Sequence, residues 1–153
     1  MTVAETVRDM SQTTPMTWVF DVDATLVDAI TGSSLRPGAQ DLLASLRAEG
    51  CRTVLWSAGG AAYARRRATQ HGIAHLFDAF EAKDERDGAG KLCVAGVVDE
   101  PAAAVFVDDQ PEDLPDHVEV VAVPPYLSHQ PSDRGLASLQ RGPTGRIEVT
   151  LNQ

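Results

Sequence analysis

Cysteine, basic residues and long apolar runs are all scarce in this 153-residue sequence. The two cysteines, Cys51 and Cys93, form no C-x-x-C pair and indicate no disulfide framework. The 13 basic residues against 22 acidic ones give a net charge of −9, which disfavours nucleic acids and membrane surfaces as partners. No apolar stretch is long enough to span a bilayer, and residues 1–16 contain no apolar core of the signal-peptide type. We therefore expect a cytoplasmic protein without a membrane partner.

The remaining composition is that of one globular domain, with 43% hydrophobic and 23% charged residues. The polar residues 1–15 are expected to form a flexible N-terminal segment. Residues 16–123 carry the recurring apolar patterns and are expected to form the folded core. Residues 124–153 are rich in Pro, Ser and Gly, which predicts an irregular C-terminal extension. Within it, residues 146–151 are either an edge strand or a partly ordered tail.

Apolar strands and helical patterns alternate through the expected core. Strands are predicted at residues 17–22, 51–58, 77–83, 102–109 and 117–123. Helices are predicted at residues 36–50 and 59–72, where Pro37 suits a first turn and Gly50 and Gly72 suit helix ends. Strands that alternate with helices predict an α/β fold, with a Rossmann-like parallel sheet in a three-layer α/β/α arrangement.

Polar residues stand where the predicted strands end, and ligands bind beyond the carboxyl ends of such strands. They are Asp21 and Asp23 at the end of the first strand, Ser57 at the end of the second, Lys83 near the end of the third, and Asp108 and Asp109 at the end of the fourth, with Asp113 four residues further on. The apolar Ala58 follows Ser57 directly. Several carboxylates packed together repel one another and need a cation. Oxygen ligands without a His/Cys cluster favour Mg²⁺. A set of solvated loop acids is the alternative, which we disfavour because the acids follow different apolar strands.

These residues resemble the motifs of the haloacid dehalogenase (HAD) superfamily. "DVDATL" is similar to its D-x-D-x-T-[LV] signature, and "VLWSA" followed by Gly-Gly is similar to its second motif, a strand that ends in Ser or Thr. "VFVDDQPED" is similar to its fourth motif, an acidic pair with another Asp four residues beyond the second member. The resemblance covers about residues 16 to 123 and implies that this core is catalytic.

The resemblance implies a role for each matched residue. Asp21 corresponds to the nucleophile that forms an aspartyl-phosphate, and Asp23 to the general acid/base. Ser57 and Lys83 correspond to the residues that bind and neutralise the phosphoryl group, and Thr25 and Ala58 belong to the same phosphate-binding set. The resemblance also implies a Mg²⁺ cofactor. Asp21, the Asp23 backbone carbonyl and Asp109 would hold it, with support from Asp108 and Asp113. Because dehalogenases lack the acid at position 23, its presence favours phosphate esters as substrates.

Two positions qualify the resemblance. Lys83 and Lys91, which lie 25 and 17 residues before Asp108, both have spacings found in the superfamily. We favour Lys83 because it follows a predicted strand directly, whereas Lys91 follows a Gly-rich loop. Ala24 stands where many members have Gly. Members that resemble the carboxy-terminal-domain phosphatases carry Glu there, so we do not interpret Ala24 as an inactivating change.

The chain lacks room for the cap domain that many members insert. Only 33 residues separate Asp23 from Ser57, and only 25 separate Ser57 from Lys83, with a helix expected in each gap. What remains is a short flap at residues 27–38, so the site should be open. We therefore expect a capless, Mg²⁺-dependent phosphatase for accessible phosphate esters, bulky ones included. The alternatives are a phosphotransferase, or a non-catalytic member that uses the acidic site as a Mg²⁺-binding or phosphoryl-binding regulatory module.

Overall fold

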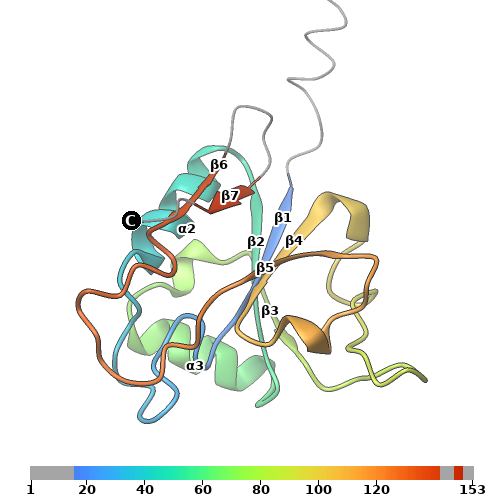
Figure 1. Ribbon diagram of the computed structural model, residues 1–153, viewed down its shortest axis with the longest axis horizontal. Coiled ribbons are helices and arrows are strands. Elements are labelled where there is room, and N and C mark those ends of the chain that lie inside the picture. Colours follow the sequence, from blue (N-terminus) through green and yellow to red (C-terminus); the bar gives the residue numbers. More distant parts are fainter. Residues whose placement is uncertain (1–15, 142–146, 150–153) are drawn as a thin grey trace, which may run out of the picture.

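The computed structural model describes residues 16–141 and 147–149 (Figure 1). Five parallel strands form its main sheet in the order β3-β2-β1-β4-β5. They are β1 (Thr17–Asp21), β2 (Arg52–Ser57), β3 (Ala79–Ala82), β4 (Ala104–Asp108) and β5 (Glu119–Ala122). The predicted α/β fold with a Rossmann-like parallel sheet is confirmed. The expectation of flexibility for residues 1–15 lies outside the described residues.

The three central strands, β1, β2 and β4, are apolar at their centres and buried along almost their whole length, because both faces of the sheet are covered. Successive side chains of a strand point to opposite faces, so Trp18 and Phe20 pack in one core cluster and Val19 in the other. Trp56 from β2 and Phe106 from β4 join Val19 in the second cluster. This double burial fixes the register of β1 and therefore the position of the residues that follow it.

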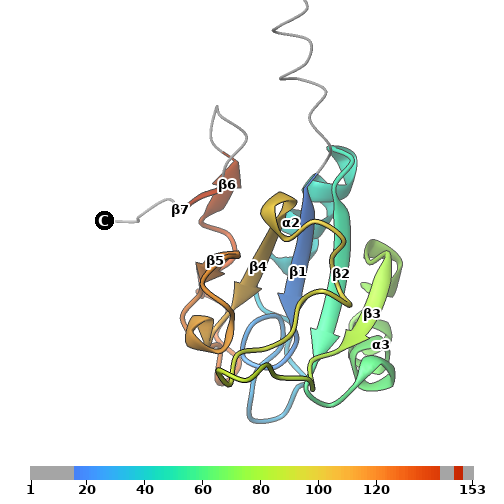
Figure 2. The same ribbon diagram turned by 90° about the vertical axis from the view of Figure 1, so that its right-hand side faces the viewer.

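The two faces of the sheet are covered in different ways. The helices α2 (Ala39–Ala48) and α3 (Ala61–Gln70) contribute Leu43, Leu46 and Ala64 to the first core cluster, and η1 (Ala74–Leu76) lies beside them. The other face is covered by irregular chain from residues 84–100 and by the short 3-10 helices η2 (Pro101–Ala103) and η3 (Pro111–Asp113) (Figure 2). This layer lacks an α-helix because residues 84–100 contain three glycines and no sustained helical spacing.

The connections around the sheet are short. The flap (residues 27–38) and α2 link β1 to β2, while α3 and η1 link β2 to β3. Each connection is filled by its own helix, so neither contributes an inserted domain. Among the described residues, no helix is long and apolar enough to cross a membrane.

The chain after β5 runs back across the molecule. Residues 124–138 form the C-terminal segment. This segment contains turns but neither helix nor strand. A two-stranded antiparallel sheet follows, formed by β6 (Leu139–Arg141) and β7 (Ile147–Val149). A strand thus forms within residues 146–151, but it pairs with β6 and not with an edge of the main sheet. The division of the chain at residue 123 stays a prediction.

Candidate active site

The carboxyl ends of the central strands bring most of the predicted residues to one pocket of about 400 Å³. Asp21 ends β1 and Ser57 ends β2, and these strands are direct neighbours in the sheet. Lys83 follows β3, and its backbone N–H donates to the Ser57 carbonyl at 2.8 Å. The predicted residues that line the pocket are Asp21, Asp23, Ser57, Ala58, Lys83, Asp109 and Asp113. Parallel strands therefore gather side chains that are far apart in the sequence.

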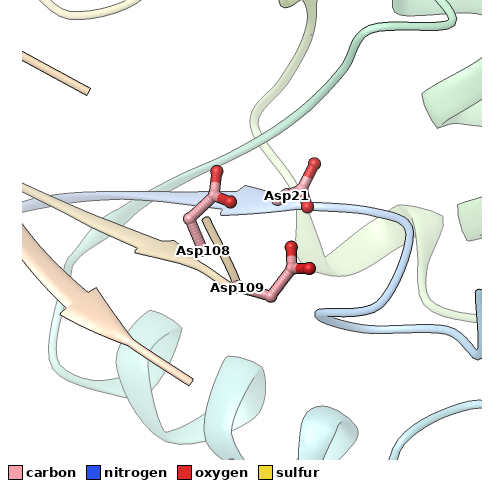
Figure 3. Close-up of side chains that lie close together, drawn as sticks. All are labelled: Asp21, Asp108 and Asp109. Carbon is pink, nitrogen blue, oxygen red and sulfur yellow. The ribbon is translucent and has the colours of Figure 1, made fainter. Parts of the chain in front are cut away.

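Three carboxylates form the acidic cluster of the site, Asp21 from β1 and Asp108 and Asp109 from the end of β4 (Figure 3). Each offers an oxygen within 4.8 Å of those of the other two. Asp21 and Asp108 are buried, whereas Asp109 is half-buried. Hard oxygen donors at this spacing fit the preferences of Mg²⁺, which binds through a few carboxylates and keeps several waters. The donor set therefore suits the predicted metal, which would neutralise charge at this position when bound.

Lys83 supplies the counter-charge among these carboxylates. Its ammonium lies 2.6 Å from Asp108 Oδ2 and 3.3 Å from Asp21 Oδ1, and 5.4 Å from the centroid of the Trp56 ring. Lys91 points elsewhere, because its ammonium donates to the backbone carbonyl of Glu112. The geometry thus supports the choice of Lys83 over Lys91 as the lysine that faces the site.

Burial dominates the electrostatics of the nucleophile candidate. Burial, followed by the neighbouring Asp108 carboxylate, raises the pKa of Asp21 from 3.8 to about 8 against the opposing effect of Lys83. Burial acts to lower the pKa of Lys83, but the charges of Asp21 and Asp108 outweigh it and raise that pKa, so the lysine stays charged. One ammonium does not compensate three carboxylates, and an additional cation would favour the ionised form of Asp21.

Hydroxyl groups and loop amides surround the cluster. The Thr25 hydroxyl lies 3.2 Å from Asp21 Oδ2 and 3.4 Å from Asp109 Oδ1 and bridges the two acids. Ser57 is 2% exposed, and its hydroxyl oxygen accepts the Gly59 N–H at 3.0 Å. The Gly60 N–H donates to the Ser57 carbonyl at 3.0 Å, and Gly60 adopts a φ of 102°, a conformation that suits glycine. This turn opens α3 and directs Ser57 and Ala58 to the pocket.

Asp23 stands apart from the acidic cluster although it lines the same pocket. Its side chain is exposed, and its Oδ1 accepts a hydrogen bond from the Tyr63 hydroxyl at 2.7 Å. Arg67, one turn further along α3, donates to the same hydroxyl at 3.2 Å. The two aspartates of the D-x-D motif thus occupy different surroundings, one buried among charges and one at the mouth of the pocket. Separate surroundings allow separate roles.

Asp113 lies outside the acidic cluster. Its carboxylate is 3.7 Å from the guanidinium of Arg86, and η3 carries it on the far side of the pocket. The structure therefore places Asp113 in the pocket wall, and its support for a metal stays a prediction.

Sequence reasoning missed Tyr63, Arg36 and Tyr126, which contact Asp23 or the turn at Ala24 that follows it. Ala24 has a φ of 65° and is the one non-glycine residue with a positive φ among the described residues. Its carbonyl accepts the Tyr126 N–H at 2.7 Å and lies 3.4 Å from a guanidinium nitrogen of Arg36. Helical spacing from Ser57 could have placed Tyr63 near the site. Nothing local in the sequence indicates Arg36, because its partners come from a distant part of the chain.

Fold and site together define a class, the α/β proteins that gather carboxylates, a lysine and a hydroxyl at the ends of parallel strands. Residues 8–115 match the family model of the haloacid dehalogenase-like hydrolases, which is more than half of the chain. The chain belongs to this family, as the resemblance predicted. A comparison with curated proteins found no significant match.

Solved phosphatase structures share the fold. The essential RNA polymerase II CTD phosphatase Fcp1 has a TM-score of 0.58 at 16% identity, over 80% of this chain and 45% of that chain. A variant of fission yeast Fcp1 bound to beryllium fluoride has a TM-score of 0.56 at 17% identity, with the same coverages of 80% and 45%. The core domain of a Streptococcus pneumoniae TIGR4 protein, proposed to be a phosphoglycolate phosphatase, has a TM-score of 0.51 at 12% identity, over 80% of this chain and 85% of that chain. These likenesses establish the fold, and this chain spans less than half of either Fcp1 chain.

Proposed function

We propose that this protein is a Mg²⁺-dependent phosphatase that acts on accessible phosphate monoesters through an aspartyl-phosphate intermediate. The proposal is carried by one observation: Asp21, Ser57, Lys83 and Asp109 line the same pocket. Membership of the haloacid dehalogenase-like hydrolases supports it. The phosphatase activities named for structures of the same fold are consistent with it.

In the proposed reaction a carboxylate oxygen of Asp21 attacks the phosphorus, and the bond from phosphorus to the ester oxygen breaks. Asp23 gives its proton to that leaving oxygen, and its exposed position at the pocket mouth supports this role. A water then attacks the phosphorus of the acyl-phosphate and gives its proton to Asp23. Inorganic phosphate leaves and Asp21 is restored. Lys83 offsets the charge of the phosphoryl oxygens throughout, and a bound Mg²⁺ would add charge neutralisation.

The test is hydrolysis of 4-nitrophenyl phosphate by the wild-type protein, with Mg²⁺ and with a chelator, beside Asp21→Asn. We expect turnover that depends on Mg²⁺ and falls by at least about a thousandfold in Asp21→Asn, because the substitution removes the nucleophile. Failure of the wild type on a broad panel of phosphate esters and phosphopeptides would sink the proposal. A stable aspartyl-phosphate that is not turned over would indicate the regulatory alternative.

A matched pair of lysine variants tests the assignment inside the site. Lys83→Ala should lower kcat strongly because Lys83 faces the acidic cluster, whereas Lys91→Ala should leave it near the wild-type value. Both variants need the same folded far-ultraviolet circular dichroism spectrum as the wild type. The reverse pattern, with loss in Lys91→Ala alone, would show that the assignment is wrong.

A further inference from the structure

Two large hydrophobic side chains are exposed among the described residues, Ile30 at 74% and Leu127 at 54%. They come from the flap and from the C-terminal segment, and their backbones are hydrogen-bonded neighbours. The Ile30 N–H donates to the Leu127 carbonyl at 3.1 Å, and the Ala29 N–H donates to the Tyr126 carbonyl at 3.0 Å. Single exposed hydrophobic residues are ordinary, but two that adjoin each other form an apolar patch that calls for an explanation.

The patch adjoins the catalytic pocket. Leu127 and Ala29 line the same pocket of about 400 Å³ as Asp21, Asp23 and Lys83. A pocket of this volume has room for an organic group beside a phosphate. One end of it is charged and matches a phosphoryl group, whereas Leu127 and Ala29 give it an apolar wall. The proposed proton donor Asp23 lines the pocket with both, so the leaving group of a bound ester would lie within reach of the apolar wall.

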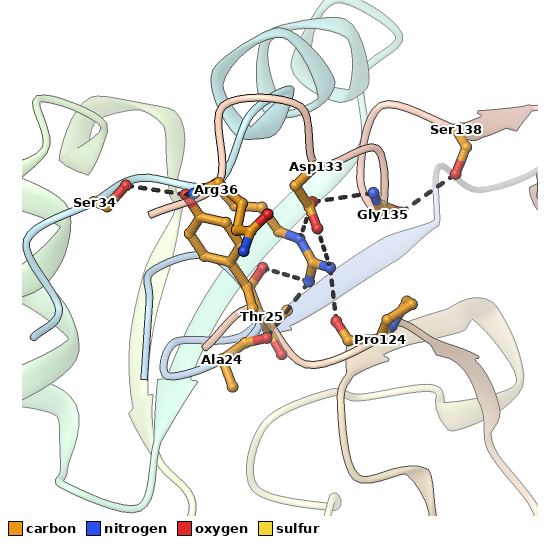
Figure 4. A network of polar contacts seen from close by, with 10 residues as sticks. Ala24, Thr25, Ser34, Arg36, Pro124, Asp133, Gly135 and Ser138 are labelled. Atoms are coloured by element: carbon orange, nitrogen blue, oxygen red, sulfur yellow. Dashed lines mark hydrogen bonds and ion pairs between the residues drawn. The ribbon is translucent and has the colours of Figure 1, made fainter. Parts of the chain in front are cut away.

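The stretch that carries Leu127 is tied to a buried anchor, Arg36, whose contacts with Pro124 and Asp133 are drawn in Figure 4. The Arg36 side chain, which is fully buried, is 2.6 Å from Asp133 Oδ2 through Nε and 3.2 Å from Asp133 Oδ1 through Nη2. It also donates to the Pro124 carbonyl at 2.6 Å. A Cβ at Gly135 would collide with the guanidinium, so a larger residue there would force Arg36 to move. Both ends of the stretch that carries Leu127 are therefore tied to Arg36.

The same anchor reaches the turn beside the nucleophile. Arg36 Nη1 lies 3.4 Å from the Ala24 carbonyl and 3.3 Å from the Thr25 carbonyl, and the Tyr126 N–H donates to the Ala24 carbonyl at 2.7 Å. The C-terminal segment is thus fixed relative to Asp21 and Asp23 by backbone contacts of Pro124 and Tyr126 before Leu127 and by the Asp133 carboxylate after it. A side chain positioned in this way can select among substrates, because it does not have to be ordered on binding.

We propose that the C-terminal segment forms the leaving-group side of the active site, and that Leu127, extended by Ile30, selects phosphate monoesters with an apolar group next to the ester oxygen. Phenyl phosphate, whose ring is bonded directly to the ester oxygen, is of this class. The proposal rests on the phosphatase function above. It assigns to this chain's own C-terminal segment the contact that a cap domain would provide.

The test compares Leu127→Ser with Ser128→Ala, a neighbouring exposed position outside the pocket lining. Phenyl phosphate and glycerol 1-phosphate are the two substrates. In Leu127→Ser, kcat/KM should fall about tenfold on phenyl phosphate, because the phenyl ring loses an apolar surface to bury against. On glycerol 1-phosphate it should change by less than about twofold, and Ser128→Ala should match the wild type on both esters. Each ratio compares two variants on one ester, so the different reactivities of the leaving groups cancel.

Binding without turnover separates this inference from the proposed function. With Mg²⁺ present, the wild type should bind benzylphosphonate about tenfold more tightly than methylphosphonate, and Leu127→Ser should abolish the preference. If the wild type shows the preference but hydrolyses nothing, the selection by Leu127 stands and the phosphatase function fails. Equal binding of the two phosphonates, no binding of either, or equal losses of kcat/KM on both esters would overturn the inference. So would a wild-type dimer that Leu127→Ser converts to a monomer, because the patch would then be a self-association surface.

Discussion

Two irregular stretches flank the acidic cluster, residues 84–100 and the C-terminal segment, and only the second adds a buried ion pair to its apolar packing. The first packs Leu92, Val94 and Val98 into an apolar core against the sheet. The second buries Tyr126 and Leu136 as well, but it is held in addition by the Arg36–Asp133 ion pair and by a hydrogen bond from Arg36 to the Pro124 carbonyl. Apolar packing tolerates small shifts, whereas hydrogen bonds and ion pairs demand fixed geometry. The segment proposed to contact substrate is therefore the one whose attachment depends more strongly on exact geometry.

The largest effect is expected from Asp133→Asn, which removes one charge of the buried pair and leaves Arg36 without its counter-ion. Removing one partner of a buried ion pair costs about 3 kcal/mol or more. We expect the free energy of unfolding in urea to fall by about that amount. We also expect kcat to fall at a temperature where the variant is fully folded, since Arg36 contacts the turn after Asp23.

A double-mutant cycle with Arg36→Met controls that measurement. If Arg36→Met in the Asp133→Asn background costs as much as in the wild type, the two side chains are not coupled, and the anchor is not the pair described here. A kcat that stays at the wild-type value in Asp133→Asn would limit the anchor to a structural role.

The contrasting variant in residues 84–100 is Val94→Ala. Val94 is buried and lies outside the pocket lining, so the loss of two methyl groups should lower the free energy of unfolding by about 2 kcal/mol. Because the apolar core tolerates small shifts, kcat/KM on phenyl phosphate should stay within about twofold of the wild type. Equal losses of kcat in Val94→Ala and Asp133→Asn would remove the distinction between the two stretches.

A smaller effect, in the stabilising direction, is expected from Ala24→Gly. Ala24 has a φ of 65°, where a Cβ costs about 1 kcal/mol relative to glycine. The variant should therefore gain up to about 1 kcal/mol in chemical denaturation, offset in part by the greater freedom of glycine in the unfolded chain. A loss of stability would show that the surrounding contacts, and not the turn itself, impose this conformation.

The smallest effect concerns pH and the flap. Burial acts to raise the pKa of Asp28, but hydrogen bonds from Thr31 and Ser34 outweigh it and lower the pKa from 3.8 to about 2. A lowered pKa means that Asp28 stabilises the fold above pH 3.8, and that this contribution is lost as pH falls toward 2. The stability difference between the wild type and Asp28→Asn should therefore shrink over this range in urea denaturation. A difference that does not change with pH would contradict the lowered pKa.

The sequence predicts most of the sheet and most of the acidic cluster, because both follow from local patterns. Asp21, Ser57 and Asp108 end their strands and Lys83 follows its strand directly, and parallel pairing then brings the strand ends together. The sequence favours Lys83 over Lys91 because Lys83 follows a strand directly, and the ammonium contacts of the two lysines, which local spacing does not determine, support that choice.

The irregular second layer and the attachment of the C-terminal segment could not be predicted from the sequence, for physical reasons. Residues 84–100 fill the second face with valines that have no regular spacing, so no periodic signal marks the layer. Arg36 resembles any surface arginine in the sequence, and its burial depends on Asp133 and Pro124 arriving from far along the chain. Long-range polar pairing leaves no trace in a single sequence.

The Arg36–Asp133 pair also has a consequence for the order of folding. It spans 97 positions of the chain, and β1 cannot complete its ladder before β4 has paired with it. Contacts between such distant residues form only after a long loop has closed, which makes them slow to appear. The turn beside the nucleophile should therefore acquire its final shape late, after the sheet has assembled. A folding intermediate that holds the complete sheet but has not yet docked residue 133 would have the acidic cluster in place and still be catalytically immature.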